Sequence, residues 1–289
     1  IGGRYLFIDE IHKYENWSRE IKEIYDLHRE LHIVISGSSL LQINDGHSDL
    51  SRRLTEYQMF GLSFREFMCM MTGVNIEPIE LYSLLNSPNL FCQEVKRHFH
   101  PLEYFHLYLK EGYYPFYFEN KKMYHNVIEN VINYIVDNEL TMFRGLEVGN
   151  SRRIKALLQV LSKMVPYEVD ISKLSRTLGI QRPTTLKYLK NLEEAALIRR
   201  LFTKIDTITD LQKPDKILID NSNILYTLSD SNPEIGTVRE TFFCNQLCAA
   251  GHIVEYGGLK TGDFRIDKEI VIEVGGSDKG LKQIQNEEY

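Results

Sequence analysis

Cysteine is scarce in this sequence, which has four cysteines among 289 residues. Cys69, Cys92, Cys244 and Cys248 lack the paired short spacings of a structural zinc site, and they are too sparse for a disulfide framework. Cys244 and Cys248 are one helical turn apart and suit a shared metal, but no second pair of Cys or His follows at a suitable spacing. We therefore predict reduced thiols in the protein core.

Long hydrophobic runs and an excess of positive charge are also missing. The longest apolar runs, such as 33–35 and 270–272, have the length of a strand and are far shorter than the roughly 20 residues of a membrane-spanning helix. The net charge of -6 gives no overall attraction to nucleic acid or to an anionic membrane, so DNA binding would have to be local. Since no signal peptide is visible either, we expect a cytoplasmic protein with no membrane partner.

The residues that are present alternate between strand and helix patterns at the start of the chain. An apolar run at 4–8, an amphipathic helix at 17–31 and a second apolar run at 32–36 predict a β-α-β unit with a parallel sheet. From Gly61 to Gly145 the pattern becomes helical and unusually aromatic, and four prolines divide it into short helices.

A different pattern follows between Asn150 and Phe202. A short helix at 171–178 stopped by Gly179, and a second helix from Arg182 to Leu197, form a helix-turn-helix pattern. Strand-like residues at 201–205 and 216–219 supply a wing, so this unit resembles a winged helix. A helix at 238–250 and three strands, with a hairpin at 267–269, are predicted for the end of the chain.

The second helix of this pattern carries the candidate contacts to DNA. We predict that five of its side chains lie near phosphates or bases: Arg182, Thr184, Thr185, Lys187 and Lys190. The alternative is a module that packs against protein, because Glu193 and Glu194 on the same helix would repel a nucleic-acid backbone.

Two carboxylates follow the first apolar run, at Asp9 and Glu10. An apolar strand that ends in Asp-Glu has the form of a Walker B element, in which Asp9 would hold the water shell of Mg²⁺ and Glu10 would polarise an attacking water. Such a strand is expected to be buried on both faces of a central parallel sheet. The alternative for an isolated match is a strand that ends in a solvated acidic turn.

Further stretches accompany this element in a fixed order. They are Phe7-Ile8-Asp9-Glu10-Ile11-His12-Lys13-Tyr14, Ser36-Gly37-Ser38-Ser39, Ser51-Arg52-Arg53, Gly61-Leu62-Ser63-Phe64-Arg65-Glu66-Phe67 and Gly112-Tyr113-Tyr114-Pro115. In this combination the chain resembles a bacterial and archaeal AAA+ ATPase family whose members carry a carboxyl-terminal region of unknown function. The resemblance covers nearly the whole chain.

The resemblance implies an α/β fold with four regions. These are a partial P-loop-type core at 1–60, a helical subdomain at 61–149, a winged helix at 150–205 and an incomplete nuclease-like α/β region at 206–289. It also implies that the parent protein uses ATP and Mg²⁺, with Ser38 near the first sensor position. Arg52 and Arg53 would reach the phosphate of a neighbouring subunit as arginine fingers in a homo-oligomer, and a solvated charge pair is the alternative.

The phosphate-binding loop of this family does not occur in the sequence. Members usually carry a Gly-x-x-x-x-Gly-Lys-Ser/Thr loop upstream of Walker B, whereas this chain begins at Ile1 and opens almost directly into a strand. We therefore expect a piece of a longer reading frame that neither binds ATP tightly nor hydrolyses it, because the backbone nest and the lysine for the phosphates are missing.

Acidic residues near the end of the chain resemble those of PD-(D/E)xK nucleases. Glu240, Asp263 and Glu273 fit the acidic positions, and two strand carboxylates of that fold hold Mg²⁺ while a lysine two residues past the second orients the hydrolytic water. The lysine position is Gly275, a departure from the pattern. The nearby lysines that would have to substitute are Lys279 and Lys282. We therefore favour an inactive nuclease-like scaffold or a hairpin with solvent-facing acids.

Three hypotheses for function remain. The leading one is a nucleotide-driven switch in which ATP held between subunits moves the winged helix and the tail. The second is an effector that binds or cleaves DNA and has a regulatory ATPase part. The third is a scaffold with no activity of its own.

Overall fold

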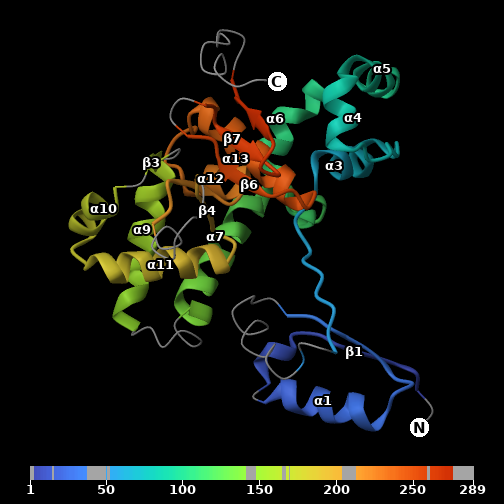
Figure 1. Cartoon of the computed structure of the whole chain (residues 1–289), viewed down its shortest axis with the longest axis vertical. Coiled ribbons are helices and arrows are strands. Elements are labelled where there is room, and N and C mark those ends of the chain that lie inside the picture. Colours follow the sequence, from blue (N-terminus) through green and yellow to red (C-terminus); the bar gives the residue numbers. More distant parts are fainter. Residues whose placement is uncertain are drawn as a thin grey trace.

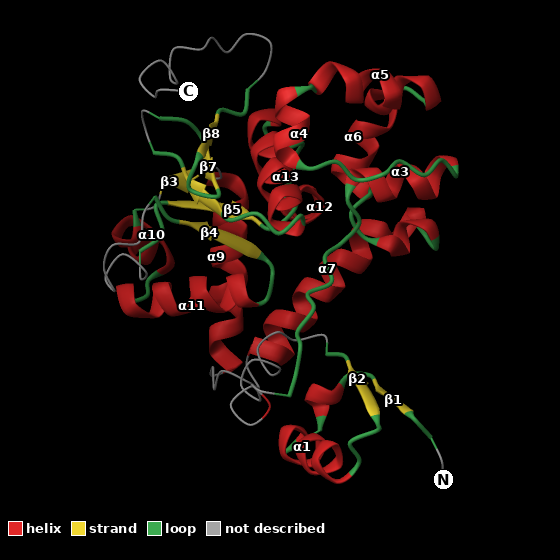
Figure 2. Cartoon of the chain, turned by 45° about the vertical axis from the view of Figure 1, so that its right-hand side comes forward, coloured by secondary structure: helices red, strands yellow, loops and turns green. Residues whose placement is uncertain are grey.

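The computed structural model of the chain describes residues 3–14, 16–37, 50, 53–140, 148–164, 167–168, 170–203, 213–258 and 261–275. Four of the predicted site residues lie outside these ranges: Ser38, Arg52, Lys279 and Lys282. The chain is an α/β protein with many helices and small sheets (Figures 1 and 2). None of the helices in the described ranges has the length and apolarity needed to cross a membrane.

The predicted β-α-β unit is present at the start of the chain. Strand β1 (Tyr5–Ile8) pairs in parallel with β2 (His32–Ile35), and helix α1 (Trp17–Leu27) connects them after a 3-10 turn at Ile11–Lys13. We call residues 3–37, 50, 53 and 54 the N-terminal lobe. It lies at one end of the molecule, and an extended segment leads from it to helix α3 (Phe64–Thr72) (Figure 1).

Among the described residues, one face of the lobe's sheet is covered. Helix α1 packs Trp17 and Ile21 against the sheet, with Ile11 and Leu50 completing a small buried cluster. On the other face Tyr5 is 67% exposed, Phe7 72% and Val34 52%. The expectation that β1 is buried on both faces is therefore wrong for this chain, because no described segment packs on that second face.

The aromatic region forms short helices, as predicted. After α3 come α4 (Leu81–Asn86), α5 (Pro88–His98), α6 (Pro101–Glu111), 3-10 turns at Pro115–Phe118 and Lys121–Met123, α7 (Tyr124–Tyr134) and a π-helical segment at Ile135–Glu139. Pro88 and Pro101 stand in the first turns of their helices, where a missing N–H has no cost. Ser63 and Glu66 form a capping box that starts α3.

The next segment folds around a three-stranded antiparallel sheet with the order β3-β5-β4. A 3-10 turn at Val148–Asn150 leads into α9 (Ser151–Met164), which is followed by β3 (Tyr167–Glu168), α10 (Ile171–Leu178), α11 (Arg182–Glu194), β4 (Ile198–Leu201) and β5 (Lys216–Ile219). Gly179 ends α10 with a left-handed backbone, φ 62°, as predicted from its position. Helix α11 ends at Glu194, three residues earlier than expected.

The last segment contains helices α12 (Ser222–Leu228) and α13 (Ile235–Ala249) and an antiparallel sheet of β6 (Val254–Tyr256), β7 (Phe264–Ile266) and β8 (Ile270–Ile272). The predicted hairpin is present. Asp267 and Lys268 both have positive φ, and the Glu269 N–H donates to the Ile266 carbonyl at 3.0 Å, which is the geometry of a type I′ turn.

One hydrophobic cluster runs through most of the chain after the lobe. Its buried members range from Phe67 in α3 to Val238 in α13 and include Leu157, Leu189 and Ile217. The predicted boundaries at 149/150 and 205/206 therefore fall within a shared core. We call the described residues from 61 to 275 the main body.

A buried asparagine ties the Gly112-Tyr113-Tyr114-Pro115 stretch into this body. Asn223, fully buried, accepts hydrogen bonds from the Tyr113 N–H (2.9 Å) and the Tyr124 hydroxyl. Its amide donates to the carbonyls of Tyr108 (3.1 Å) and Leu109 (2.9 Å). A Cβ at Gly61 would lie 2.4 Å from the Tyr113 ring, so only glycine fits there. The stretch is thus a structural anchor.

Candidate functional site

The strongest candidate site lies where β1 and β2 end. Because the two strands are parallel, Asp9 and Glu10 after β1 meet Ser36 after β2 at one edge of the sheet. The Ser36 hydroxyl donates a hydrogen bond to the Asp9 carboxylate, and the Glu10 N–H donates to the same oxygen at 3.1 Å. The Ile11 N–H donates to the Ser36 carbonyl at 3.0 Å, which holds the two strand ends together.

Glu10 has an unusual backbone. Its φ of 54° and ψ of 36° are left-handed, a region that non-glycine residues occupy at a cost of about 1–3 kcal/mol. The Glu10 carboxylate lies 2.8 Å from the Lys13 ammonium one turn later. The hydrogen bond that the Lys13 ammonium donates to Glu10, together with the charge of Glu10, raises the pKa of Lys13. Such strain is concentrated at functional sites in proteins.

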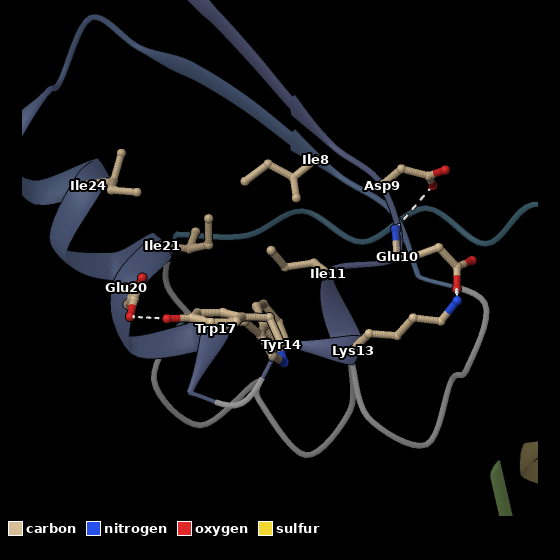
Figure 3. Close-up of a pocket in the computed structure, with 10 residues that line it drawn as sticks. All are labelled: Ile8, Asp9, Glu10, Ile11, Lys13, Tyr14, Trp17, Glu20, Ile21 and Ile24. Carbon is tan, nitrogen blue, oxygen red and sulfur yellow. Dashed lines mark hydrogen bonds and ion pairs between the residues drawn. The ribbon is translucent and has the colours of Figure 1, made fainter. Parts of the chain in front are cut away.

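A hollow of about 380 Å³ opens beside these acids, between β1 and α1. Isoleucines and Trp17 line its interior, while Asp9 and Glu10 lie at one edge and Tyr14 and Glu20 at another (Figure 3). The Tyr14 hydroxyl donates to the Glu20 carboxylate at 2.7 Å, and this bond raises the pKa of Tyr14. In Figure 3 the side chains of Asp9 and Glu10 point away from the apolar interior.

Arg53 does not point away from its own chain as an arginine finger does. Its guanidinium contacts both carboxylate oxygens of Asp26 on α1, with Nε–Oδ1 at 3.1 Å and Nη2–Oδ2 at 3.2 Å. This bidentate ion pair links residue 53 to helix α1. Sequence reasoning missed the pairing because Asp26 and Arg53 are far apart in the chain.

The candidate nucleic-acid surface on α11 is partly present. Arg182, Lys187 and Lys190 are exposed, and Thr184 is half-buried. Thr185 is fully buried, and its hydroxyl bonds Ser175 at 2.8 Å and the Gln181 carbonyl at 3.2 Å. We therefore remove Thr185 from this surface and assign it to the contact between α10 and α11.

The two acids of α11 are neutralised within the chain. Glu193 accepts hydrogen bonds from the Arg200 Nε (2.6 Å) and the Arg200 N–H (2.9 Å), and Glu194 lies 3.5 Å from the Lys190 ammonium. The repulsion predicted from Glu193 is therefore weakened, whereas the ion pair of Glu194 uses the charge of Lys190, itself a predicted DNA contact.

The acids near the end of the chain surround a lysine that sequence reasoning did not consider. Lys216, at the start of β5, places its ammonium 2.7 Å from the Glu240 carboxylate and 3.9 Å from that of Asp263. The other Asp263 oxygen accepts the Val274 N–H at 2.8 Å. Lys216 and Glu240 are both buried. No signal in the sequence near Glu273 identifies Lys216, because it comes from a different sheet.

Glu273, the third predicted acid, and Gly275 follow strand β8. Glu273 is half-buried and Gly275, at the predicted lysine position, is exposed. Among the side chains that the structure describes, no three His, Cys, Asp or Glu residues are placed to hold a metal ion together. The Mg²⁺ site at Asp263 and Glu273 stays a prediction, and the positive charge that the structure places near Asp263 is that of Lys216.

Comparison with known proteins finds matches in both the lobe and the main body. Residues 2–68 match the family model of the AAA domain, and residues 102–234 match that of a domain of unknown function (DUF8612). The chain is 24% identical, over 298 aligned positions, to the uncharacterized protein MJ1637 of Methanocaldococcus jannaschii. The alignment covers 96% of this chain and 63% of that relative, so the chain spans less than two thirds of the relative's length. No solved structure matches.

These matches support an AAA-like relationship for the region that contains Asp9, Glu10 and Ser36. The match to the domain of unknown function crosses the predicted boundary at 149/150, in agreement with the shared core there.

Proposed function

We propose that the complete protein is an AAA-type ATPase-related switch whose catalytic acids are Asp9 and Glu10. The observation that carries the proposal is the convergence of Asp9, Glu10 and Ser36 at the carboxyl ends of two parallel strands. Ligands of open α/β sheets bind at that edge. The match of residues 2–68 to the AAA domain supports the same assignment.

The donor set suits magnesium. Mg²⁺ prefers oxygen ligands, keeps several waters, and is usually bound by one or two carboxylates together with substrate phosphates. Asp9 supplies an exposed carboxylate and Ser36 a hydroxyl beside it. When bound, the ion would neutralise charge on the phosphates. We therefore add Ser36 to the site, while Ser38 stays a prediction.

Glu10 is assigned the role of polarising the attacking water. Its ion pair with Lys13 and its left-handed backbone hold the carboxylate at the edge of the hollow. Lys13 acts here as a positioning residue. A homo-oligomer with Arg52 as the finger remains part of the proposal, whereas Arg53 would first have to leave Asp26.

The test is ATP turnover by the complete protein. Glu10→Gln is expected to lower turnover by roughly 10²–10⁴-fold while nucleotide binding persists, because the amide cannot polarise water. Glu23→Gln, on the exposed side of α1, removes the same charge and serves as the control. Turnover of Glu10→Gln equal to that of Glu23→Gln would contradict the role of Glu10.

A second candidate function is DNA binding by α11. It is favoured by the exposed Arg182, Lys187 and Lys190 on a helix whose acid Glu193 is bound by Arg200. The order α10, α11, β4, β5 supports the resemblance to a winged helix.

Binding of duplex DNA at several salt concentrations tests this function. Lys187→Ala is expected to weaken binding at low salt and to reduce the salt slope by about one, because one phosphate contact is lost. Lys122→Ala removes an exposed charge elsewhere in the main body and is the control. If Lys187→Ala and Lys122→Ala weaken binding equally, or if the protein does not bind DNA at low salt, DNA binding by α11 is contradicted.

For the acidic cluster we propose a scaffold role. Lys216 is held between Glu240 and Asp263 with little exposure, which suits a structural ion cluster joining two sheets. Divalent-metal-dependent cleavage of plasmid DNA that disappears in Asp263→Ala would overturn this and promote the nuclease alternative.

A further inference from the structure

Strand β4, in the predicted wing, carries two adjacent arginines that are both bound within the chain. The Arg199 side chain lies largely buried against Asp220, with Nη2–Oδ1 at 3.0 Å. The Arg200 guanidinium donates from Nε to the Glu193 carboxylate at 2.6 Å, and its side chain is 12% exposed. Each positive charge of β4 therefore already has a carboxylate partner, and neither is available to a phosphate group.

The two halves of helix α11 differ in how their positive charges are used. Near its carboxyl end the Lys190 ammonium lies 3.5 Å from the Glu194 carboxylate. In its first half Arg182 and Lys187 are exposed. Neither of these two has an ion-pair partner among the residues that the structure describes. The positive charge that is open to a ligand is thus concentrated in the first half of α11.

Two exposed side chains at the start of α11 are poorly suited to the helix itself. Gln181 occupies the N-cap position, yet its side chain makes no capping hydrogen bond. Arg182 follows at the first helical position, where the positive end of the helix dipole disfavours a cation. Glutamine and arginine are the side chains that pair with the edges of adenine and guanine in the major groove. In helix-turn-helix proteins the first residues of the second helix make such contacts.

Helix α10 adds further positive charge. Lys173 and Arg176 are three residues apart, so they share one side of the helix, and both are exposed. The acid at the start of α10, Asp170, directs its carboxylate to the Lys173 N–H at 2.9 Å. From 171 to 192 the sequence has five lysines and arginines and no aspartate or glutamate, whereas the whole chain has a net charge of -6. The two helices together form a basic region of an acidic protein.

A contact between buried hydroxyls fixes α10 relative to α11. The Ser175 and Thr185 hydroxyls share a hydrogen bond of 2.8 Å, and Leu174 and Leu189 belong to the large hydrophobic cluster. Arg176 directly follows Ser175, so it lies close to the start of α11. Both helices lie at the margin of the main body in two views (Figures 1 and 2). The exposed charges of α10 and of the first half of α11 are therefore close enough to contact one ligand.

We propose that α10, rather than β4, completes the DNA-binding surface of this protein, an inference that rests on the proposed DNA binding by α11. Lys173 and Arg176 bind phosphates of a duplex, since the first helix of a helix-turn-helix crosses the DNA backbone. Gln181 and Arg182 contact base edges, and Lys187 binds a further phosphate. Duplex DNA is favoured over an acidic protein segment, because such a segment would match the lysines and arginines but offers no base edge to Gln181.

The salt dependence of duplex binding, measured by fluorescence anisotropy, tests the phosphate contacts. Lys173→Ala combined with Arg176→Ala removes two contacts, so the slope of log K against log salt should become less steep by about two. The loss of affinity between about 50 and 200 mM salt is then roughly tenfold smaller than in the unmodified protein. Lys213→Ala, an exposed lysine in the wing just before β5, is the control and should leave the slope unchanged.

The same variants separate failure of this inference from failure of the DNA function. A slope that changes in Lys213→Ala and stays constant in the double variant would place the second contact on the wing and overturn the proposal. If Lys187→Ala lowers the slope while the double variant does not, α11 still binds DNA and only the role of α10 fails. If the unmodified protein does not bind the duplex at about 50 mM salt, the DNA function fails as well.

Gln181→Ala tests the base contacts on duplexes selected from a random pool. The substitution is expected to leave the salt slope unchanged, because no phosphate contact is lost. It should lower the discrimination between duplex sequences by about 5- to 100-fold. An unchanged sequence preference would contradict the contact between Gln181 and a base edge.

Chemical labelling of the unmodified protein tests the surface without any variant. Acetylation of each lysine by N-hydroxysuccinimidyl acetate is quantified by peptide mass spectrometry, with and without duplex. Lys173 and Lys187 should be protected at low salt, while Lys213 and Lys122, both exposed, should stay reactive. Protection of Lys213 in place of Lys173 would refute the assignment to α10. Equal protection by polyglutamate at the same charge concentration would identify an acidic protein as the partner and refute the assignment to DNA.

Discussion

Two strands of this protein, β1 in the N-terminal lobe and β5 in the main body, look alike in sequence and differ in their surroundings. Both are short apolar strands of four residues. In β5, Ile217 and Ile219 face the large cluster while Leu218 faces the cluster beneath α13, and all three are fully buried. In β1 alternate residues are exposed, because α1 is the only described helix that covers the sheet, and it covers one face.

The difference shows that an apolar run predicts a strand, but it does not predict whether one or both faces of that strand are buried. At roughly 25 cal/mol per Å² of buried apolar surface, a sheet covered on one face gains much less from burial than one covered on both. The four buried side chains of the lobe's cluster therefore stabilise it less than the main body is stabilised. We expect the two regions to unfold separately, and Trp17, the only tryptophan in the sequence, reports on the lobe alone.

The largest effect is expected from Asn223→Ala in the main body. The substitution removes five side-chain hydrogen bonds and leaves the Tyr113 N–H and the Tyr124 hydroxyl buried without their Asn223 acceptor. We expect a loss of about 3–5 kcal/mol in the free energy of unfolding, measured by far-UV circular dichroism in urea. Asn75→Ala, an exposed asparagine, is the control. A matching shift in Trp17 fluorescence would show that the two regions unfold together.

A somewhat smaller effect is expected from Ile21→Ala in the lobe. In the unmodified protein the fluorescence of Trp17 should change at a lower urea concentration than the circular dichroism. Ile21→Ala is expected to cost about 2–4 kcal/mol and to shift only the fluorescence transition, because Ile21 packs within the lobe's cluster. Leu157→Ala, a buried leucine of the main body, should shift only the dichroism. Coincident transitions in all three proteins would refute the separation.

Local signals in the sequence predicted much of this fold correctly. Pro88 and Pro101 start helices, Gly179 ends one, and the turn at Asp267 and Lys268 joins two strands. Each of these depends on the backbone preferences of one or two residues, which act wherever the segment lies. The parallel pairing of β1 and β2 followed in the same way from the order strand, helix, strand.

The features that sequence reasoning missed depend on contacts between distant residues. Lys216 meets Glu240 and Asp263 from another sheet, and Arg53 meets Asp26 across the lobe. Thr185 was assigned to a surface because its residue type is polar, yet its hydroxyl has partners within reach that make burial favourable. A polar residue type indicates the need for a partner and does not tell whether that partner is solvent, a ligand or the chain itself.

The same reasoning applies to the catalytic assignment. Asp9 and Glu10 were predicted from sequence, because a strand and the residues after it are local features. For the hydroxyl beside them the sequence offered the stretch Ser36-Gly37-Ser38-Ser39. Among the described residues Ser36 contacts Asp9, and Ser38 lies outside them. Which hydroxyl reaches Asp9 depends on how β1 and β2 are aligned. In this sheet Ile8 is paired with Ile35, so the next residues, Asp9 and Ser36, lie side by side.

A smaller effect is expected from Arg53→Ala, which breaks the bidentate pair with Asp26 on the partly exposed side of the lobe. Exposed ion pairs contribute about 0.2–1 kcal/mol, so the Trp17 transition should move slightly, and less at high salt. Arg29→Ala, whose contact with Asp26 is longer at 3.5 Å, should move it less. If Arg53 is instead an arginine finger, ATP turnover of the complete protein would fall by orders of magnitude while the fluorescence transition stays unchanged.

The smallest effect concerns acid and the start of α10. The Asp170 carboxylate accepts the Lys173 N–H at 2.9 Å, and this hydrogen bond lowers the pKa of Asp170 in the folded protein. Because the folded pKa lies below the unfolded one, the contribution of the charged cap is complete above the unfolded pKa, about 3.9, and is lost as pH falls through the lowered value. Asp170→Asn keeps an acceptor at the cap and cannot titrate.

The stability difference between the two proteins, measured by circular dichroism in urea, should therefore favour the wild type at pH 6 and shrink as the solution is acidified below about pH 4. Other carboxylates titrate equally in both proteins and cancel in the difference. The Trp17 transition should respond identically in both, since Asp170 belongs to the main body. A difference that stays constant with pH would mean that the cap acts through its hydrogen bond alone and that its charge contributes nothing at this helix end.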